Sequence, residues 1–286
     1  MLNFHIYDVF TDTPFNGNPL AIVEGADGLT TAQMQTIARQ FNLSETIFVQ
    51  TPDDPAHTAK VRIFFPTAEI PFAGHPTIGC AIHLANGADT VTLEEVAGLV
   101  PVTLHNNTAE FTAPKLPRAL PAIPDRSLVA AALGLDPTDL KDTPISNLEG
   151  GPSFLYVQID SLETLARTRL SEPAFTRATD AAGPTDAIYA YVLTGPSSAQ
   201  ARMFAPHAGI GEDPATGSAT AIFAAQLNAT GHLPATGTTR FDLQQGVEMG
   251  RPSQLRLTID TAEDEITAIR VAGQAVKIAS GQIRIP

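Results

Sequence analysis

Apolar and polar residues along the chain follow two spacings, one typical of strands and one of helices. Strand-like alternation occupies residues 2–10 and resumes at 20–23, and the turn-forming run TDTPFNGNP separates the two. Helical spacing follows a capping threonine, Thr30 or Thr31, and ends near Asn42. Further strands are predicted at 47–49, 60–65, 90–93 and 99–104, and a second helix starts near Thr77 and ends at Asn86 and Gly87.

A proline-rich segment, PKLPRALPAIP, interrupts these patterns at residues 114–124 and predicts a domain linker. The 286 residues favour two domains, which we place at 1–118 and 119–264. After the linker, strands are expected at 154–159, 187–193, 201–205, 239–243, 255–259 and 265–278, and helices near 127–133, near 162–168 and from Thr216 onward.

An internal repeat relates the two halves. Residues at alternate positions of 62–70 recur 140 positions later: Arg62, Phe64, Pro66, Ala68 and Ile70 return as Arg202, Phe204, Pro206, Ala208 and Ile210. Both copies then pass through a glycine-containing turn, GHPTIG or DPATGS, into a helical pattern. The repeat predicts two similar α+β domains that face each other across a cleft, which is the default position of a site.

Composition limits the possible partners. With 17 Lys and Arg against 30 Asp and Glu the net charge is −13, which disfavours nucleic acid and anionic membranes. A single cysteine, Cys80, excludes an internal disulfide and fits a reducing cytoplasm. No targeting segment or membrane span is expected. The seven histidines show no ligand-like spacing, so the sequence predicts no metal and no other cofactor.

The run GEDPATGSATA, residues 211–221, is the strongest candidate for chemistry. Its glycines, acids and hydroxyl residues stand directly before a helical pattern, and a helix N-terminus offers unpaired N–H groups to an anion. The related start near GHPTIG would offer a second set. Two such helix ends in one cleft favour a carboxylate substrate or a reaction that develops an oxyanion.

The motifs FNGNPLAIV, LSETIFV, GHPTIG, GEDPATGSA and GQAVKIASGQIRI, in this order along nearly the whole chain, resemble the PhzF family of phenazine-biosynthesis-like proteins. The resemblance implies a diaminopimelate-epimerase-like fold. Each of two pseudo-symmetric domains would be a mostly antiparallel sheet wrapped around a central helix, with the active site in the cleft between them. The C-terminal strands, from about 265 to 286, would return to the first domain, and the protein would be a homodimer.

The same resemblance implies a cofactor-independent isomerase that moves a proton within a small carboxylate-bearing metabolite, which could be cyclic and unsaturated. The family's catalytic glutamate, histidine and aspartate fall on Glu45, His75 and Asp213. Substrate-binding positions are expected at Asn18, Gly74, Thr77, Thr216, Gly217 and Ser218, and more weakly at Arg251 and Ser253. The epimerase relatives use two cysteines at the helix starts, where this chain has Gly74 and Ser218, so a two-thiol racemase is excluded.

Simpler interpretations of these residues remain open. Glu45 could be an exposed loop acid, Asp213 the N-cap of its helix, and His75 a hydrogen-bonding group. A non-catalytic anion-binding or regulatory protein on the same fold is therefore an alternative to the isomerase. A phosphate-binding loop is excluded because GEDPATGSA lacks its lysine, and no GxSxG elbow surrounds Ser218 as a hydrolase would require.

Overall fold

The computed structural model describes all residues, 1–286. The first half contains strands β1 (Leu2–Val9), β2 (Asn18–Val23), β3 (Glu45–Gln50), β4 (Ala59–Phe64), β5 (Glu69–Ile70), β6 (Thr90–Glu95), β7 (Gly98–His105) and β8 (Thr108–Thr112), and helices α1 (Thr31–Phe41) and α2 (Gly74–Leu84). Every element predicted here is present, while β5 and β8 have no counterpart among the predicted elements.

The second half contains strands β9 (Arg118–Ala119), β10 (Ser146–Glu149), β11 (Ser153–Gln158), β12 (Ile188–Gly195), β13 (Ser198–Ala205), β14 (Ile210–Asp213), β15 (Gly237–Gln245), β16 (Ser253–Ala262) and β17 (Glu265–Ile283), and helices α3 (Arg126–Ala132), α4 (Leu162–Arg167), α5 (Ala174–Ala182) and α6 (Gly217–Ala229). The patterns do not predict β9, β10, β14 or α5. The proline-rich segment contains β9, which pairs with β10, so the proposed boundary at 118 cuts a strand of the second half.

Local chemistry sets the ends of α1 where the spacing places them. The hydroxyl of Thr30 accepts from the backbone N–H of Gln33, and the Gln33 side chain accepts from the N–H of Thr30. This capping box satisfies two N–H groups that the helix leaves unpaired. Asn42 ends the helix in the left-handed conformation, which asparagine tolerates better than most residues.

Strand pairing follows the same sequence of orientations in both halves. In the first half β1–β2 is antiparallel, β2–β3 parallel, β3–β4 antiparallel, β4–β6 parallel, β6–β7 antiparallel and β7–β8 antiparallel. The pairs β10–β11, β11–β12, β12–β13, β13–β15, β15–β16 and β16–β17 repeat that series. The duplicated residues thus occupy equivalent strands.

The arginine and phenylalanine that recur in the internal repeat make the same contacts in each copy. Arg62 on β4 pairs with Glu69 at 2.6 Å and lies over the Phe64 ring at 5.3 Å. Arg202 on β13 pairs with Glu212 at 2.7 Å and lies over Phe204 at 5.0 Å. Each arginine ties a long strand to the short hairpin strand that leads to a central helix.

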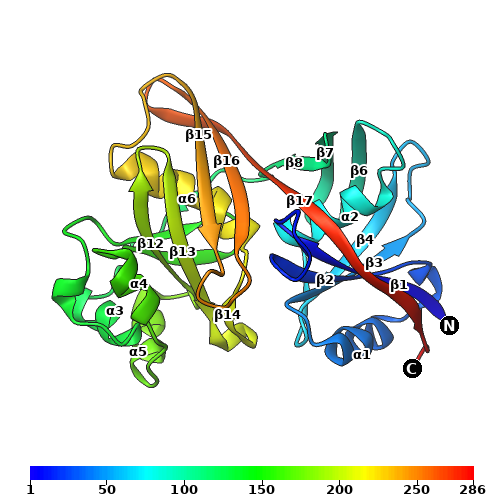
Figure 1. Ribbon diagram of the computed structural model, residues 1–286, viewed down its shortest axis with the longest axis horizontal. Helices are drawn as coiled ribbons and strands as arrows, with labels where there is room; N and C mark the ends of the chain where they lie inside the picture. The colour runs from blue at the N-terminus through cyan, green and yellow to red at the C-terminus, as the bar shows by residue number, and fades with distance from the viewer.

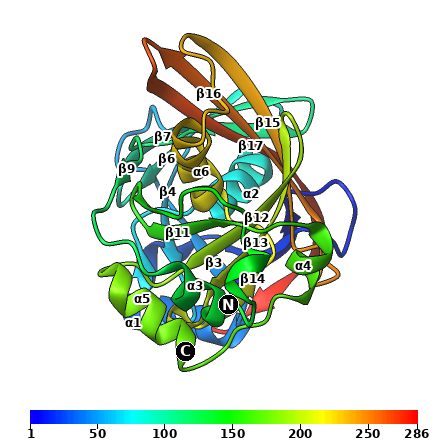
Figure 2. The same ribbon diagram turned by 90° about the vertical axis from the view of Figure 1, so that its left-hand side faces the viewer.

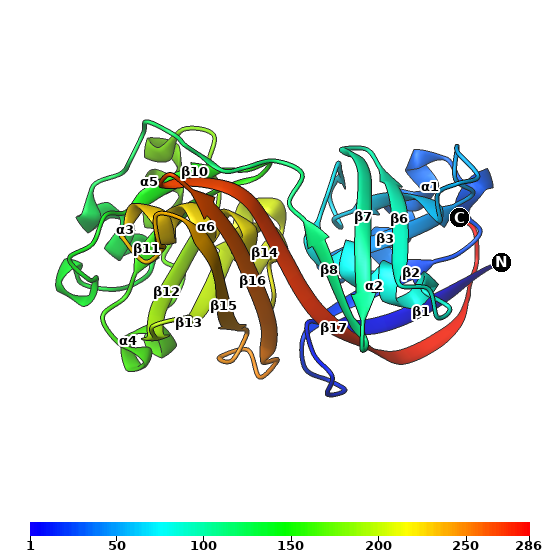
Figure 3. The same cartoon turned by 90° about the horizontal axis from the view of Figure 1, so that it is seen from above.

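The long strand β17 connects the two groups of elements seen in Figure 1. Residues 265–272 pair with β16, residues 270–274 with β8 and residues 275–283 with β1. Figure 3 shows β17 leaving β16 on one side and passing across to lie along β1 on the other. The strand therefore belongs to both halves, with its last part in the first half.

Helices α2 and α6 lie at the centre of the structure, with strands around them (Figure 2). All residues from Gly74 to Ala81 of α2 are buried, and nine residues of α6 are buried. A helix that is apolar on all sides is stable only inside a core. One cluster of buried side chains includes Phe10 and Phe111 from the first half and Tyr156 and Phe223 from the second, so this core is continuous between them.

Candidate active site

The N-termini of α2 and α6 meet at two glycines. A Cβ atom added to Gly217 would lie 3.2 Å from the Cα of Gly74, and one added to Gly74 would lie 2.8 Å from the ring of Phe111. Neither position has room for a larger residue without movement of its neighbours. The two expected glycine positions are therefore brought into direct contact, and the two helix ends face the same point.

Backbone donors at these helix ends remain available. Neither helix has a side-chain cap, because Ala73 has no polar side chain and the Thr216 hydroxyl bonds elsewhere. The N–H groups of Thr77 and Thr216 are used, by the Ala73 carbonyl at 3.2 Å and the Gln245 side chain at 3.3 Å. No side chain caps the N–H groups of His75, of Ser218 or of either glycine, which lie in the first turn of each helix and so have no partner within it. These groups can bind an anion.

Glu45 and His75 lie side by side next to these donors. Glu45 is the first residue of β3 and His75 the second residue of α2, and both are buried. The Nδ1 atom of His75 is 3.0 Å from Oε2 of Glu45, but neither ring nitrogen makes an aligned hydrogen bond. The Glu45–His75 pair therefore retains hydrogen-bonding capacity that a substrate in the site can use.

Asp213, the last residue of β14, accepts three hydrogen bonds, two of which join the two halves. Asn18 and Ser44 of the first half donate to Oδ1 at 2.8 and 3.2 Å, and Thr216 donates to Oδ2 at 2.5 Å. Gln245 donates to the Thr216 hydroxyl at 2.9 Å and so fixes that hydroxyl as a donor. Asp213 is therefore no helix cap, since Thr216 occupies the N-cap position.

Burial and the nearby carboxylate of Glu45 raise the pKa of Asp213 to about 7. Hydrogen bonds from Thr216 and Asn18, and the charge of His75, oppose this shift but do not outweigh it. Two neighbouring carboxyl groups in a buried site do not both ionise easily. Asp213 is thus partly protonated near neutral pH.

Thr77 is turned away from the helix ends and toward Glu95, a buried residue that the sequence analysis overlooks. The Thr77 hydroxyl is 2.7 Å from both the Ala73 carbonyl and Oε1 of Glu95. One hydroxyl hydrogen cannot serve both, so a protonated Glu95 donates to Thr77. Burial raises the pKa of Glu95 to about 8 in agreement with this. Its position could be recognised from the alternation in β6, where Val91, Leu93 and Glu95 all face inward.

The weaker candidates support the site from outside. The Arg251 guanidinium donates to the carbonyl oxygens of Asn16 and Gly17 and pairs with Asp8 at 2.5 Å, so it holds the loop that leads to Asn18. Ser253 is buried and donates to the Arg251 carbonyl at 3.2 Å. The side chain of Ser218 is partly buried in the first turn of α6 and has no hydrogen bond.

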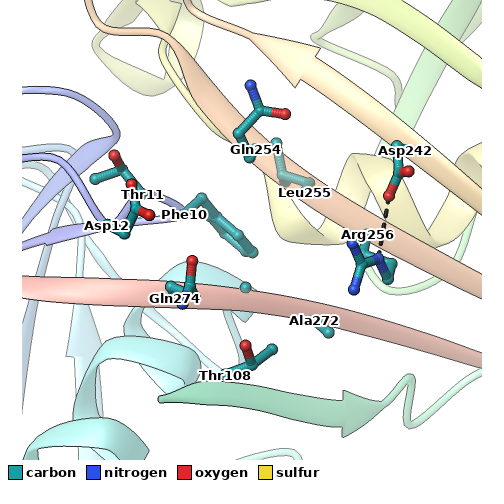
Figure 4. A pocket seen from close by; sticks show the side chains of 11 residues that line it. Phe10, Thr11, Asp12, Thr108, Asp242, Gln254, Leu255, Arg256, Ala272 and Gln274 are labelled. Atoms are coloured by element: carbon teal, nitrogen blue, oxygen red, sulfur yellow. Dashed lines mark hydrogen bonds and ion pairs between the residues drawn. The ribbon is translucent and has the colours of Figure 1, made fainter. Parts of the chain in front are cut away.

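A groove of about 260 Å³ lies behind the helix ends (Figure 4). It is lined by residues such as Phe10, Gln254 and Gln274, and contains none of Glu45, His75 and Asp213. The Phe10 ring packs on Gly273 of β17 and reaches toward Gly217, so it separates the groove from the helix ends. The three catalytic candidates are each less than a tenth exposed, which describes a closed site.

Solved structures share the fold of this chain. A Bacillus anthracis phenazine biosynthesis protein of the PhzF family matches with a TM-score of 0.89 at 25% identity, covering 99% of both chains. A probable proline racemase from Agrobacterium radiobacter matches with a TM-score of 0.65 at 11% identity, covering 100% of this chain and 94% of its own. The fold is thus that of PhzF proteins and proline racemases.

The chain belongs to the family of phenazine biosynthesis-like proteins, whose model matches residues 7–281. An uncharacterized isomerase of Mesorhizobium japonicum is 40% identical over 99% of both chains. The trans-2,3-dihydro-3-hydroxyanthranilate isomerase of Pseudomonas aeruginosa is 32% identical, also over 99% of both. The resemblance found in the motifs is confirmed, and the chain is an isomerase. No helix of the structure has the length and apolar character needed to cross a membrane.

Proposed function

We propose that the protein is a cofactor-independent isomerase that moves a proton from one carbon to another within a small, carboxylate-bearing, unsaturated metabolite. The observation behind this proposal is the meeting of Glu45, His75 and Asp213 at two uncapped helix ends. The relative that acts on trans-2,3-dihydro-3-hydroxyanthranilate supports a cyclic substrate of this kind.

In this proposal the Glu45 carboxylate removes the proton from a substrate carbon and returns it to a different carbon. The electrons left by the first step spread into the unsaturated system and its carboxylate as an enolate-like anion. N–H groups of Gly74, His75, Gly217 and Ser218 stabilise that charge, because they are fixed in place before the reaction begins. One proton leaves the substrate and one returns to it, so no external acid is consumed, and in D₂O a Glu45 carboxyl that exchanges with solvent returns deuterium.

A protonated Asp213 limits the negative charge of the site. Its pKa of about 7 predicts that kcat/KM falls as pH rises above 7, because the second negative charge then repels an anionic substrate and intermediate. Asp213→Asn keeps a neutral group in place. The variant should lose this alkaline decrease. It should also bind substrate more weakly, because its hydrogen bonds with Asn18 and Ser44 are weaker than those of the carboxylate. An unchanged alkaline limb in the variant would assign the titration to another group.

We further propose that residues 1–118 with the C-terminal strand, and residues 119–264, form two diaminopimelate-epimerase-like domains with the active site in the cleft between them. The repeated order of strand pairings supports this division. Because Asn18 and Ser44 bond to Asp213 across the halves, the halves must separate for substrate to enter. We also propose that the protein is a cytoplasmic homodimer. Light scattering of the purified chain tests whether it is a dimer.

The experiment for the function is a screen of small carboxylates by thermal shift, followed by proton exchange in D₂O for each compound that binds. The proposal expects at least one unsaturated carboxylate that raises Tm and takes up deuterium at carbon. Trans-2,3-dihydro-3-hydroxyanthranilate is the first compound to test. Binding without exchange across all ligands would contradict the isomerase.

A further inference from the structure

A second cluster of chemically capable side chains lies at the far end of α2. His83 is in the last turn of this helix, eight residues and so about 12 Å along the axis from His75. His5 on β1 and Glu24, just after β2, meet His83 there, since α2 packs on both strands (Figure 3). One ligand atom of each lies within 4.8 Å of the other two.

The distances in this cluster are close to those of a metal site. His5 Nε2 is 3.4 Å from one oxygen of Glu24, and His83 Nε2 is 2.9 Å from the other. Ligands on a tetrahedral Zn²⁺, with bonds of about 2.0–2.1 Å, are about 3.3–3.5 Å apart. Only small side-chain movements would thus bring two imidazoles and a carboxylate onto one ion.

The surroundings orient the histidines for this use. The hydroxyl of Tyr7 is 3.1 Å from Nδ1 of His83 and so leaves Nε2 directed at the cluster. Metal-bound histidines usually have such a partner on the other ring nitrogen. The rings of His5 and His83 pack at 4.5 Å, which restricts His5. Both histidines are mostly buried, while Glu24 is 38% exposed and leaves a path for an ion.

Long-range charge also favours a cation here. The C-terminal end of a helix has a partial negative charge, and His83 lies at that end of α2. The net charge of −13 raises the local concentration of cations near the protein. Lys277 is the one positive side chain close enough to act against this, and it is exposed.

We propose that His5, Glu24 and His83 form a zinc-binding site with a solvent molecule as fourth ligand, distinct from the active site. Two imidazoles and one carboxylate are a ligand set that Zn²⁺ takes, with one position left open. The ion would tie β1 and the end of β2 to the last turn of α2. The spacing of these residues along the chain, 19 and then 59 positions, gives no such prediction, and the proposal departs from the metal-free expectation from sequence.

The test uses the untagged full-length chain, because a histidine tag would bind the same ions. Zn²⁺ is titrated by calorimetry, and Co²⁺ is used as a spectroscopic probe of coordination. We expect one ion per chain, a d–d absorption typical of four-coordinate Co²⁺, and a rise of Tm with Zn²⁺. His83→Gln and Glu24→Gln should each abolish these effects. Tyr7→Phe should weaken Zn²⁺ binding about tenfold or more, because it removes the support of His83.

His57→Gln is the matched control. His57 also pairs with a glutamate, Glu94 at 2.7 Å, but no third ligand accompanies them, so the variant should bind Zn²⁺ as the wild type does. If wild-type binding is weaker than about 0.1 mM, or if His83→Gln binds as tightly as wild type, the proposal is wrong. Circular dichroism of each variant confirms that it is folded. If a variant does not fold, the titration of the wild type with Zn²⁺ alone tests the proposal.

Discussion

Glu95 allows a quantitative prediction from its burial. The side chain is neutral in the folded protein because burial raises its pKa from 4.5 to about 8. At pH values between 4.5 and about 8, Glu95 is ionised in the unfolded chain but still protonated in the folded chain. Stability then falls with rising pH by about 1.4 kcal/mol per unit. The accumulated cost is about 3 kcal/mol at pH 7 and about 5 kcal/mol at pH 8 and above, as upper bounds.

The substitution Glu95→Gln removes this cost and keeps the shape. A glutamine amide can donate to the Thr77 hydroxyl as the protonated acid does, and it does not titrate. We therefore expect the variant to unfold at a higher urea concentration than wild type at pH 8, by a few kcal/mol of unfolding free energy. The difference should shrink as pH falls and disappear below pH 4.5, where Glu95 becomes protonated in both states.

The neighbouring residue supplies a control of opposite sign. Glu94 accepts hydrogen bonds from the N–H groups of Asp54 and Asp53 and pairs with His57, and these contacts lower its pKa to about 2. Its stabilising effect is present above pH 4.5 and is lost as pH falls toward 2. Glu94→Gln should thus destabilise the protein at neutral pH. A Glu95→Gln effect that does not change with pH would refute the reasoning.

Two further predictions concern packing between the halves. Gly217→Ala should lower stability by about 1–3 kcal/mol and reduce turnover, since its Cβ would lie 3.2 Å from the Gly74 backbone. Gly211→Ala is the control and should be tolerated, because nothing lies within 4 Å of its added Cβ. Equal decreases of Tm in the two variants would contradict this prediction. Arg251→Ala should cost about 1–3 kcal/mol because a buried carboxylate and two carbonyls lose their donor. Arg256→Ala is the control and should change stability by about 0.5 kcal/mol or less, because its ion pair with Asp242 is exposed. Urea melts compare the Arg251 and Arg256 variants.

Local patterns were sufficient to predict most of the fold. The ends of α1 follow from a capping box and an asparagine within a few residues, and the strands of the repeat follow from alternation over 62–70 and 202–210. Strand β8 was harder to predict because it is short and is stabilised by pairing with β17, more than 150 residues away. Helix α5 has an amphipathic pattern that the prediction did not include.

The candidate active site was also only partly predictable from local sequence. Motifs indicated Glu45, His75 and Asp213, and the structure brings them together, but their roles remain a proposal. The interpretation of Asp213 as a cap follows from its place before a helix, whereas two of its three hydrogen bonds come from Asn18 and Ser44, 195 and 169 residues away. No local rule reveals such partners. Glu95 was missed because a glutamate in a strand is usually assumed to face solvent.

The most direct test of the central claim is solvent exchange catalysed by Glu45→Gln. With a turned-over substrate in D₂O, the wild type should incorporate deuterium at the carbon that receives the proton. The variant retains the shape of Glu45 but has no carboxylate that can remove a proton. It should bind the substrate, keep the wild-type fold, and show no exchange or product. Deuterium uptake at the wild-type rate would show that another group moves the proton, and the proposed mechanism would then be wrong.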